Sequence, residues 1–326
     1  MSGPTKTIAG AAGALALALA ATLGTASAPA AAAVTAETAS IAAGDRTGPP
    51  EAGMVTAKNL QVMSWNMCGS QRSTWHCEGT GTAQQKTDVV KYHVQNDYVH
   101  AALLQEVCED DLTALMAQLG PGWSKSFAPY QWSQGADGKW NSRCGEDTGR
   151  ADRIGTAIVL KGQMADAREY PLTQPYVGQQ RPFQCATAVY WNVRLCNVHT
   201  SPLGSNPDHP TWDYRDDQLA EIKAIVNTFP KTVLGGDFNS LPPDDPNNKD
   251  AWVWPEGLYS TGPGTEGYQE CDQTGASRTG RATHDSGAKI DYLFGNQTRR
   301  WCAVADSAFS DHHVVIESVA VASVVA

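Results

Sequence analysis

Six short polar strings along the chain carry the residue types that metal-assisted hydrolysis requires. They are Trp65-Asn66, Gln105-Glu106-Val107, Asn197-Val198-His199, Gly235-Gly236-Asp237-Phe238-Asn239, Lys289-Ile290-Asp291-Tyr292 and Ser310-Asp311-His312-His313. Each string follows a short apolar run, which is typical of a buried strand. The pattern therefore places carboxylates, amides and histidines at one end of a set of strands, where a metal-assisted phosphoester hydrolase would need them.

Three of these polar side chains are candidate ligands for a hard cation. Glu106 ends the most apolar expected strand, where a carboxylate is either solvated beyond the core or a ligand for an ion such as Mg²⁺. Asn66, also at a strand end, could supply an amide oxygen to the same ion, although alone it is little better than a turn residue. Asp311 precedes the last strand, and a surface turn is an equal alternative for it.

Asp237 and Asn239 are two residues apart and would project to the same side of an extended chain. A carboxylate beside an amide can orient water and a phosphoryl oxygen. The two preceding glycines permit a sharp turn or a close approach to a ligand. The alternative is an Asx-type turn, which the string in isolation favours, because Gly, Asp and Asn are common turn residues.

Asp291 and two histidines are the candidates for proton transfer. Asp291 is flanked by apolar residues on an expected strand, and burying an unpaired acid is costly, so we expect a histidine partner. His199 ends the run 195–198, and a strand-end histidine with a purely structural role is an equal alternative. Nothing in the pattern gives His313 a role.

The elements that must position these residues follow from hydrophobic periodicity. Strands are expected over residues 59–64, 98–104, 156–160, 186–193, 195–198, 232–234, 289–294 and 314–319. Helices are expected over residues 84–94, 109–119 and 211–229. Because strands dominate and helices come singly between them, we expect an α/β fold of two packed sheets with helices outside.

The N-terminal residues differ in composition from the rest. Residues 1–33 have a lysine near the start, an Ala/Leu/Gly-rich run and small residues suited to cleavage between Ala28 and Ala33, which is the form of a signal peptide. A membrane anchor is the alternative, but the apolar run is shorter than the ~18–20 residues that a span needs. Residues 34–57 are expected to be a flexible leader, and residues 58–326 one domain. We therefore expect a secreted, extracellular protein with no stable membrane insertion.

All eight cysteines follow the expected signal peptide. An even number in a secreted chain favours disulfides, and the absence of a Cys-x-x-Cys pair disfavours a zinc site. We predict the pairs 68–77, 108–144, 185–196 and 271–302. Only the third has a local argument, since a hairpin between Cys185 and Cys196 would bring them together.

The formal net charge of −10 limits the partners. Proteins that bind nucleic acid mainly through phosphate contacts are usually basic, and this chain has no basic cluster larger than Arg299-Arg300. Stable, metal-free DNA binding is therefore not expected, whereas nucleic acid remains a transient substrate. We expect a monomer.

In this order, the six strings resemble those of the endonuclease/exonuclease/phosphatase superfamily. This is the metal-dependent fold of pancreatic deoxyribonuclease, abasic-site endonucleases, neutral sphingomyelinases and inositol polyphosphate 5-phosphatases. The Gly-Asp-Phe-Asn and Ser-Asp-His strings are the most specific parts. The resemblance implies a four-layer sandwich of two packed mixed β-sheets flanked by helices, with Mg²⁺ as cofactor and Mn²⁺ or Ca²⁺ as alternatives.

The resemblance also implies roles for the polar residues. Glu106, with Asn66 and Asp311, would bind a divalent cation that polarises the phosphate. His312, oriented by Asp291, would transfer a proton at the nucleophilic water or bind the phosphate.

Further roles concern the substrate. The resemblance makes His199 a candidate acid for the leaving alkoxide, and it makes Asp237 and Asn239 positioning groups for water and phosphate. Arg181 matches a substrate-binding arginine of many members, with an ordinary surface charge as an equal alternative. Some members carry an arginine shortly after Gln-Glu-Val, whereas Cys108 stands here, which puts DNA-backbone contact from this strand in doubt.

The leading hypothesis is a secreted metal-dependent phosphodiesterase, a nuclease acting on DNA or RNA, which the string His199-Thr200-Ser201-Pro202 modestly favours. A phosphatase or a sphingomyelinase-type phospholipase is the alternative. Tryptophans such as Trp252 and Trp254 could contact a membrane or bases, although packing is the commoner role. A binding module with a degenerate site is disfavoured, since the candidate catalytic residues are intact.

Overall fold

The structure is a computed structural model that describes residues 56–70, 75–145, 149–260 and 266–323. The expected signal peptide, and all but the last two residues of the expected leader, lie outside the described residues. The first described element is strand β1, which begins at Thr56. Among the described residues, no helix has the length and apolar character needed to cross a membrane.

The described part of the chain forms two large mixed sheets and one small sheet. The first has seven strands: in order β15 (Thr298–Ala305), β16 (Val314–Ser323), β1 (Thr56–Asn66), β2 (Ala101–Cys108), β7 (Arg150–Lys161) and β3 (Trp123–Pro129), with β6 (Arg143–Gly145) paired to β7. The second has six: β13 (Gln269–Glu270), β14 (Asp291–Gly295), β12 (Thr232–Asp237), β11 (Val193–His199), β10 (Phe183–Ala188) and β8 (Met164–Tyr170). The small sheet contains β5 (Lys139–Asn141), β4 (Gln131–Gln134) and β9 (Val177–Gln180).

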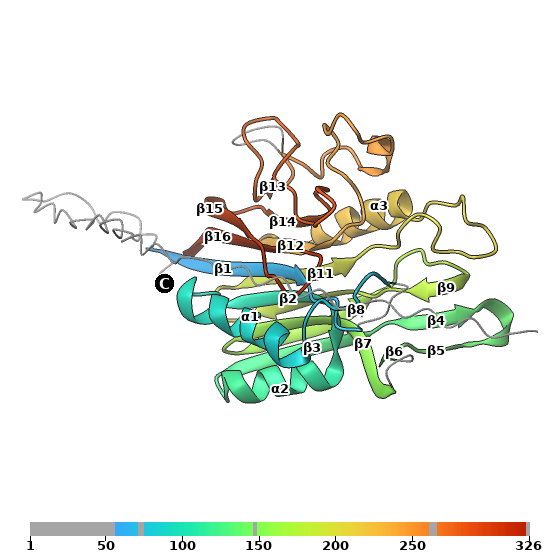
Figure 1. Cartoon of the computed structure of the whole chain (residues 1–326). Helices are drawn as coiled ribbons and strands as arrows, with labels where there is room; N and C mark the ends of the chain where they lie inside the picture. Colours follow the sequence, from blue (N-terminus) through green and yellow to red (C-terminus); the bar gives the residue numbers. More distant parts are fainter. Residues whose placement is uncertain (1–55, 71–74, 146–148, 261–265, 324–326) are drawn as a thin grey trace, which may run out of the picture. The chain divides into compact units, whose positions relative to one another are not determined.

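Helices cover both outer faces. Helices α1 (Ala83–Asn96) and α2 (Glu109–Leu119) lie together on one side, and α3 (Arg215–Val226) lies on the other (Figure 1). Short 3₁₀ turns, η2 (Gly135–Asp137) and η3 (Ala251–Val253), interrupt the loops.

Three buried apolar clusters separate these layers. The cluster between the sheets includes Leu103 and Leu195, the cluster under α1 and α2 includes Trp65 and Leu115, and the cluster under α3 includes Leu219, Ile222 and Phe294. The predicted four-layer sandwich is therefore confirmed.

Strand direction brings the polar strings to one edge. Strands β1 and β2 are parallel, as are β11 and β12, so Asn66 pairs with Gln105 and His199 pairs with Asp237 at their carboxyl ends. Strand β14 is antiparallel to β12, so its first residue, Asp291, pairs with Asp237. Strand β16 is antiparallel to β1, so the residues that precede it also reach this edge.

Several element boundaries differ from the sequence-based expectation. Helix α3 spans residues 215–226 rather than 211–229, because Asp213 accepts the backbone N–H of Arg215 and forms a turn before the helix. The expected strand 186–193 is interrupted after Ala188 by a turn in which Asn192 has a φ of 51°. Strand β2 begins at Ala101 rather than residue 98, since Tyr98 has a φ of 53°, outside the strand region.

All four predicted disulfides are present: Cys68–Cys77, Cys108–Cys144, Cys185–Cys196 and Cys271–Cys302. Cys185 and Cys196 lie directly opposite each other on β10 and β11, as the hairpin argument requires.

Gly235 and Gly236 lie inside β12 rather than in a turn. A Cβ at residue 235 would meet Leu293 Cδ2 at 2.5 Å, and one at residue 236 would meet the Val198 carbonyl oxygen at 1.9 Å. Glycine is therefore required here by close packing, including a φ of 148° at Gly236.

Candidate active site at the strand ends

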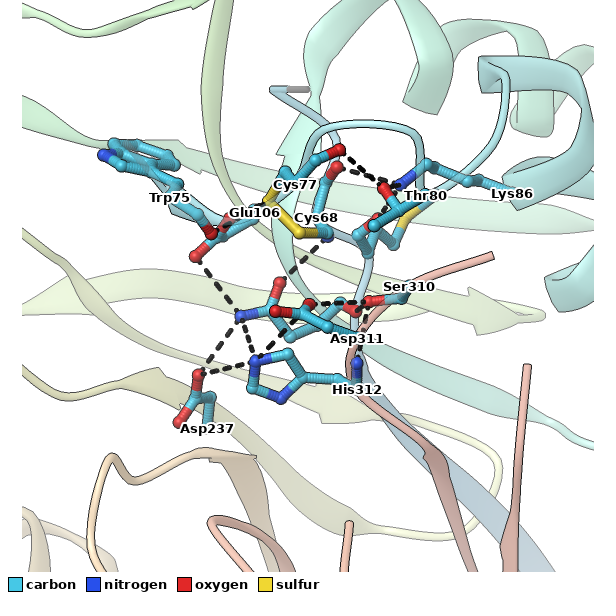
Figure 2. Close-up of a disulfide and its surroundings, with 12 residues drawn as sticks. Cys68, Trp75, Cys77, Thr80, Lys86, Glu106, Asp237, Ser310, Asp311 and His312 are labelled. Carbon is cyan, nitrogen blue, oxygen red and sulfur yellow. Dashed lines mark hydrogen bonds and ion pairs between the residues drawn. A yellow bond between two sulfur atoms is a disulfide. The ribbon is translucent and has the colours of Figure 1, made fainter. Parts of the chain in front are cut away.

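Side chains from both large sheets converge on Asp237 Oδ2. It lies 3.1 Å from Asn66 Nδ2 and 3.4 Å from His199 Nε2. Its distance from His312 Nε2 is 3.8 Å (Figure 2). Asp237 is 2% exposed, and burial raises the pKa of its carboxyl although the nearby His312 lowers it. The structure therefore brings together four of the predicted residues at one shielded point.

His312 is held by Asp291 on its other ring nitrogen. His312 Nδ1 lies 3.0 Å from Asp291 Oδ1 and 2.9 Å from Oδ2, and Asp291 has no exposed surface. Burial lowers the pKa of His312, but the charges of Asp291, Asp237 and Asp311 outweigh it and raise the pKa to about 10. The expected histidine partner of Asp291 is present, and it is an imidazolium at neutral pH.

Glu106 reaches the site because β2 is irregular at its end. The register between β2 and β7 shifts between Leu104 and Val107, and Glu106 itself has a φ of 49°. Such a bulge redirects a side chain out of the regular alternation. Glu106 Oε1 accepts a hydrogen bond from Asn66 Nδ2 at 3.3 Å, and burial raises the pKa of its carboxyl to about 7.

Asn66 presents its amide nitrogen, rather than its oxygen, to the two carboxylates. Its Oδ1 accepts the Cys68 backbone N–H at 3.0 Å, while Nδ2 donates to Glu106 and Asp237. Cation binding through the Asn66 oxygen, as the resemblance implies, would require the amide to turn over. In the described arrangement Asn66 is a hydrogen-bond donor.

Asp311 is joined to the site by its neighbours. Ser310 Oγ donates to the Asn66 carbonyl at 2.8 Å and accepts the His312 backbone N–H at 3.1 Å. Asp311 Oδ2 lies 3.2 Å from His284 Nε2. Burial alone would raise the pKa of the Asp311 carboxyl. The contact with His284 and the charge of His312 outweigh burial and lower this pKa.

Arg181 and Asn239 share one backbone acceptor. Arg181 Nη1 donates to the Thr200 carbonyl at 3.3 Å, and Asn239 Nδ2 donates to the same oxygen at 2.9 Å. Arg181 is only 9% exposed, so it is not an ordinary surface charge. The Asn239 N–H also donates to Asp237 Oδ1, which is the Asx-type turn considered for this string.

The donor set fits a divalent cation. Four carboxylates, of Glu106, Asp237, Asp291 and Asp311, lie at this edge, and ligand atoms of Asp237, Asp291 and His312 are within 4.8 Å of one another, as are those of His284, Asp311 and His312. Carboxylate oxygens suit Mg²⁺, Mn²⁺ and Ca²⁺. The chemistry of the site therefore supports a hard cation without selecting among these three.

Three further residues lie at the site although no motif or hydrophobic pattern in the sequence marked them as functional. His284 contacts Asp311, and Tyr130 contacts Glu106 and His199. Lys86 Nζ donates to the carbonyls of Met67 and Cys68 and to Thr80 Oγ1 (Figure 2).

Lys86 stabilises the turn after Asn66 from inside the protein. Burial lowers its pKa to about 8, although Glu106, Asp311 and Asp111 raise it. A lysine on an amphipathic helix is ordinarily exposed, so its residue type and position did not mark Lys86 as part of the site.

The chain belongs to the endonuclease/exonuclease/phosphatase family, whose model matches residues 63–312. Members of this family are hydrolases of phosphoric esters. The comparison with curated proteins gave no match.

Solved structures share the fold at low sequence identity. An endonuclease/exonuclease/phosphatase from Beutenbergia cavernae is 16% identical, with a TM-score of 0.55, over 81% of this chain and 72% of that one. The human Nocturnin catalytic domain with bound sulfate anion is 14% identical, with a TM-score of 0.51, over 82% and 96%. A family protein from Leptotrichia buccalis is 14% identical, with a TM-score of 0.51, over 80% and 99%.

Proposed function

We propose that this protein is a secreted, divalent-metal-dependent phosphodiesterase that hydrolyses DNA or RNA. The observation that carries the proposal is the convergence of Asn66, His199 and His312 on Asp237 Oδ2, between Glu106 and Asp291. A structural salt bridge would not need six buried polar side chains from both sheets at one point. Perturbed groups of this kind concentrate at catalytic sites.

The residues divide the chemistry of phosphodiester hydrolysis between them. A cation bound at Glu106 and Asp311 would offset negative charge on the phosphate. His312, kept protonated by Asp291, supplies a positive hydrogen-bond donor to a phosphate oxygen. Asp237 accepts a hydrogen bond from the attacking water and orients it, and Asn66 fixes the Asp237 carboxylate.

Arg181 and Asn239 would position the substrate at the rim. Both donate to the Thr200 carbonyl, so their side chains are held in one orientation relative to each other. Arg215 Nη1 in turn donates to the Asn239 carbonyl at 2.8 Å, which fixes the backbone there.

Secretion is supported by the four disulfides, which form in oxidising compartments.

A phospholipid is the second candidate substrate, because two exposed tryptophans lie close in the chain to the acidic partners of Arg215. Trp212 precedes Asp213, and Trp252 follows Asp250 closely in η3, and both acids pair with Arg215. Trp212 is 51% exposed and Trp252 60% exposed. Exposed tryptophans suit a lipid interface as well as stacking on bases.

The test uses the protein from residue 34 onwards, produced with its disulfides and incubated with plasmid DNA, single-stranded DNA, RNA or sphingomyelin. We expect hydrolysis of nucleic acid with Mg²⁺ and none with EDTA. The matched control is Asp237→Ala, which should lose most activity while its circular dichroism is unchanged.

Hydrolysis of sphingomyelin with intact plasmid and RNA would replace the nuclease proposal with the lipid alternative. If none of these substrates is cleaved in a metal-dependent way, the enzyme proposal is wrong.

A further inference from the structure

The Tyr130 hydroxyl lies between two predicted functional residues of different sheets. Tyr130 has no exposed surface, and it stands between β3 and β4. Its oxygen accepts the Glu106 backbone N–H at 3.1 Å and lies 2.8 Å from His199 Nδ1. The two rings meet edge to face, with centroids 5.7 Å apart.

These two contacts fix where the hydrogens are. The Glu106 N–H can only donate, so the Tyr130 oxygen accepts there. A buried hydroxyl also donates its own hydrogen, and among the described residues the acceptor in contact with it is His199 Nδ1. His199 Nδ1 therefore carries no hydrogen, and the neutral ring carries its hydrogen on Nε2.

The second nitrogen of His199 faces the centre of the site. His199 Nε2 lies 3.4 Å from Asp237 Oδ2, on the same oxygen that Asn66 and His312 approach. His199 is 3% exposed. Because its Nδ1 accepts the Tyr130 hydroxyl and carries no hydrogen, the ring is neutral, and Nε2 is a hydrogen-bond donor at the centre of the site.

We propose that Tyr130 is a positioning residue that holds His199 as the neutral Nε2–H tautomer, so that His199 donates a hydrogen bond to a phosphate oxygen of the substrate. In this role His199 does not transfer a proton to the leaving group, and no bond to hydrogen is broken. The substrate part of the inference rests on the proposed function, whereas the tautomer does not.

The same hydroxyl restrains Glu106. Glu106 has a left-handed backbone conformation, which a non-glycine residue adopts only where its surroundings hold it. The hydrogen bond from its N–H to Tyr130 is one such restraint. Tyr130 thus links the orientation of the expected cation ligand to the tautomer of the histidine across the site.

Nitrogen-15 NMR of the histidine rings tests the tautomer directly. In the wild-type protein at pH 7, we expect His199 to show a protonated Nε2 and an unprotonated Nδ1. In Tyr130→Phe, which removes only the hydroxyl, we expect a mixture of the two neutral tautomers and faster hydrogen exchange at the Glu106 N–H. The signals of His93 and His284, which bind Asp97 and Asp311, report whether the fold is retained.

Kinetics then test the role. On whichever substrate the protein cleaves, Tyr130→Phe should lower kcat about 10- to 100-fold with little change in KM, since a hydrogen bond used in the transition state is misdirected. The matched control is Tyr98→Phe, which removes a hydroxyl from a side chain that is 71% exposed and should leave kcat unchanged.

Two outcomes would overturn the inference. One is a wild-type His199 that is an imidazolium or carries its hydrogen on Nδ1 at pH 7. The other is a folded Tyr130→Phe protein with an unchanged tautomer and unchanged kcat. If the expected tautomer is found but no phosphodiester is hydrolysed, the proposed function is wrong and the assignment of the tautomer stands.

Discussion

His312 and Asp291 meet through a bidentate contact, in which the histidine Nδ1 lies 3.0 and 2.9 Å from the two oxygens of a carboxylate with no exposed surface. The Asp291 backbone N–H in turn donates to Thr283 Oγ1 at 2.9 Å, so the acid is held in place at the start of β14. An unpaired acid would be costly at this depth, and the imidazolium compensates for it. With Nδ1 held by Asp291, the Nε2 edge of the His312 ring is turned towards Asp237, whose Oδ2 is 3.8 Å away.

Alanine replacements of the two adjacent histidines, His312 and His313, form a matched pair of variants. His312→Ala should lower activity about 10²- to 10³-fold, the range for removal of a hydrogen-bond donor to a reacting oxygen. His313→Ala should leave activity unchanged, because among the described residues the His313 ring bonds Asp285, whose side chain is 62% exposed, and the backbone bond of His313 to Thr283 is kept in the variant. Initial rates with the cleaved substrate measure both. Equal loss in the two variants would contradict the assignment of the site to His312.

A divalent cation should stabilise the wild-type protein through Glu106. Burial raises the pKa of the Glu106 carboxyl to about 7, and a bound cation would favour the ionised form and stabilise the folded state by mass action. We expect millimolar Mg²⁺ to raise the Tm of the wild type by a few degrees and to have little effect on Glu106→Gln. Thermal unfolding with and without Mg²⁺ measures this. An equal shift in both proteins would show that the cation binds elsewhere.

The disulfide Cys68–Cys77 should matter for activity as well as stability. Its residues lie against Glu106, with Cys77 Sγ 3.5 Å from Glu106 Oε2 (Figure 2). The neighbouring Gly69 N–H donates to the Glu106 carbonyl. Replacing both cysteines by alanine should lower activity about 10-fold or more, because the segment around Glu106 is no longer fixed.

The matched control for that variant is the double alanine replacement of Cys185 and Cys196. The two bridges close similar loops, with sequence separations of 9 and 11, so each should contribute a similar ~2–4 kcal/mol to the free energy of unfolding. The control should therefore lose stability and keep most of its activity. A parallel loss of activity in both would mean that stability alone explains the effect.

Glu317 predicts a pH-dependent loss of stability. It lies on β16 with 1% exposure, and neither carboxyl oxygen has a hydrogen-bond partner among the described residues. Burial raises its pKa well above 4.5, Glu270 acts in the same direction, and Arg299 opposes them. The folded state therefore keeps a proton that the unfolded state releases above about pH 4.5, so stability should fall as the pH rises from there.

Glu317→Gln should remove this loss, because an amide does not ionise. We expect the variant to match the wild type near pH 4 and to be more stable by about 1–3 kcal/mol at pH 8. Urea unfolding at both pH values measures the difference. The control is Glu256→Gln on an exposed side chain, which should change neither value. If the difference in the free energy of unfolding between the wild type and Glu317→Gln is the same at pH 8 as at pH 4, the prediction is wrong.

Elements with a strong apolar pattern could be predicted, and edge elements could not. Strands β2, β11 and β12 are buried along their whole length, and their apolar runs predicted them. Strands β8 and β15 lie at sheet edges and are largely exposed or half-buried, so charged residues such as Arg168 and Arg299 obscure their pattern. The small sheet was also missed, because all three residues of β5 are exposed and β4 and β9 are only four residues long each.

The sequence by itself determined the chemical types at the strand ends and the fold that would gather them. Glu106, Asp237, Asp291 and His312 could be singled out because polar residues directly after apolar runs are a local feature of the chain.

Only the tertiary structure decided which of these atoms meet. The β2 bulge that turns Glu106 inward, the amide orientation of Asn66, and the contact between Tyr130 and His199 across 69 residues depend on strand register and packing. Such contacts join segments that are distant in the chain, and no local pattern encodes them, because each side chain's partner is set by the alignment of whole strands.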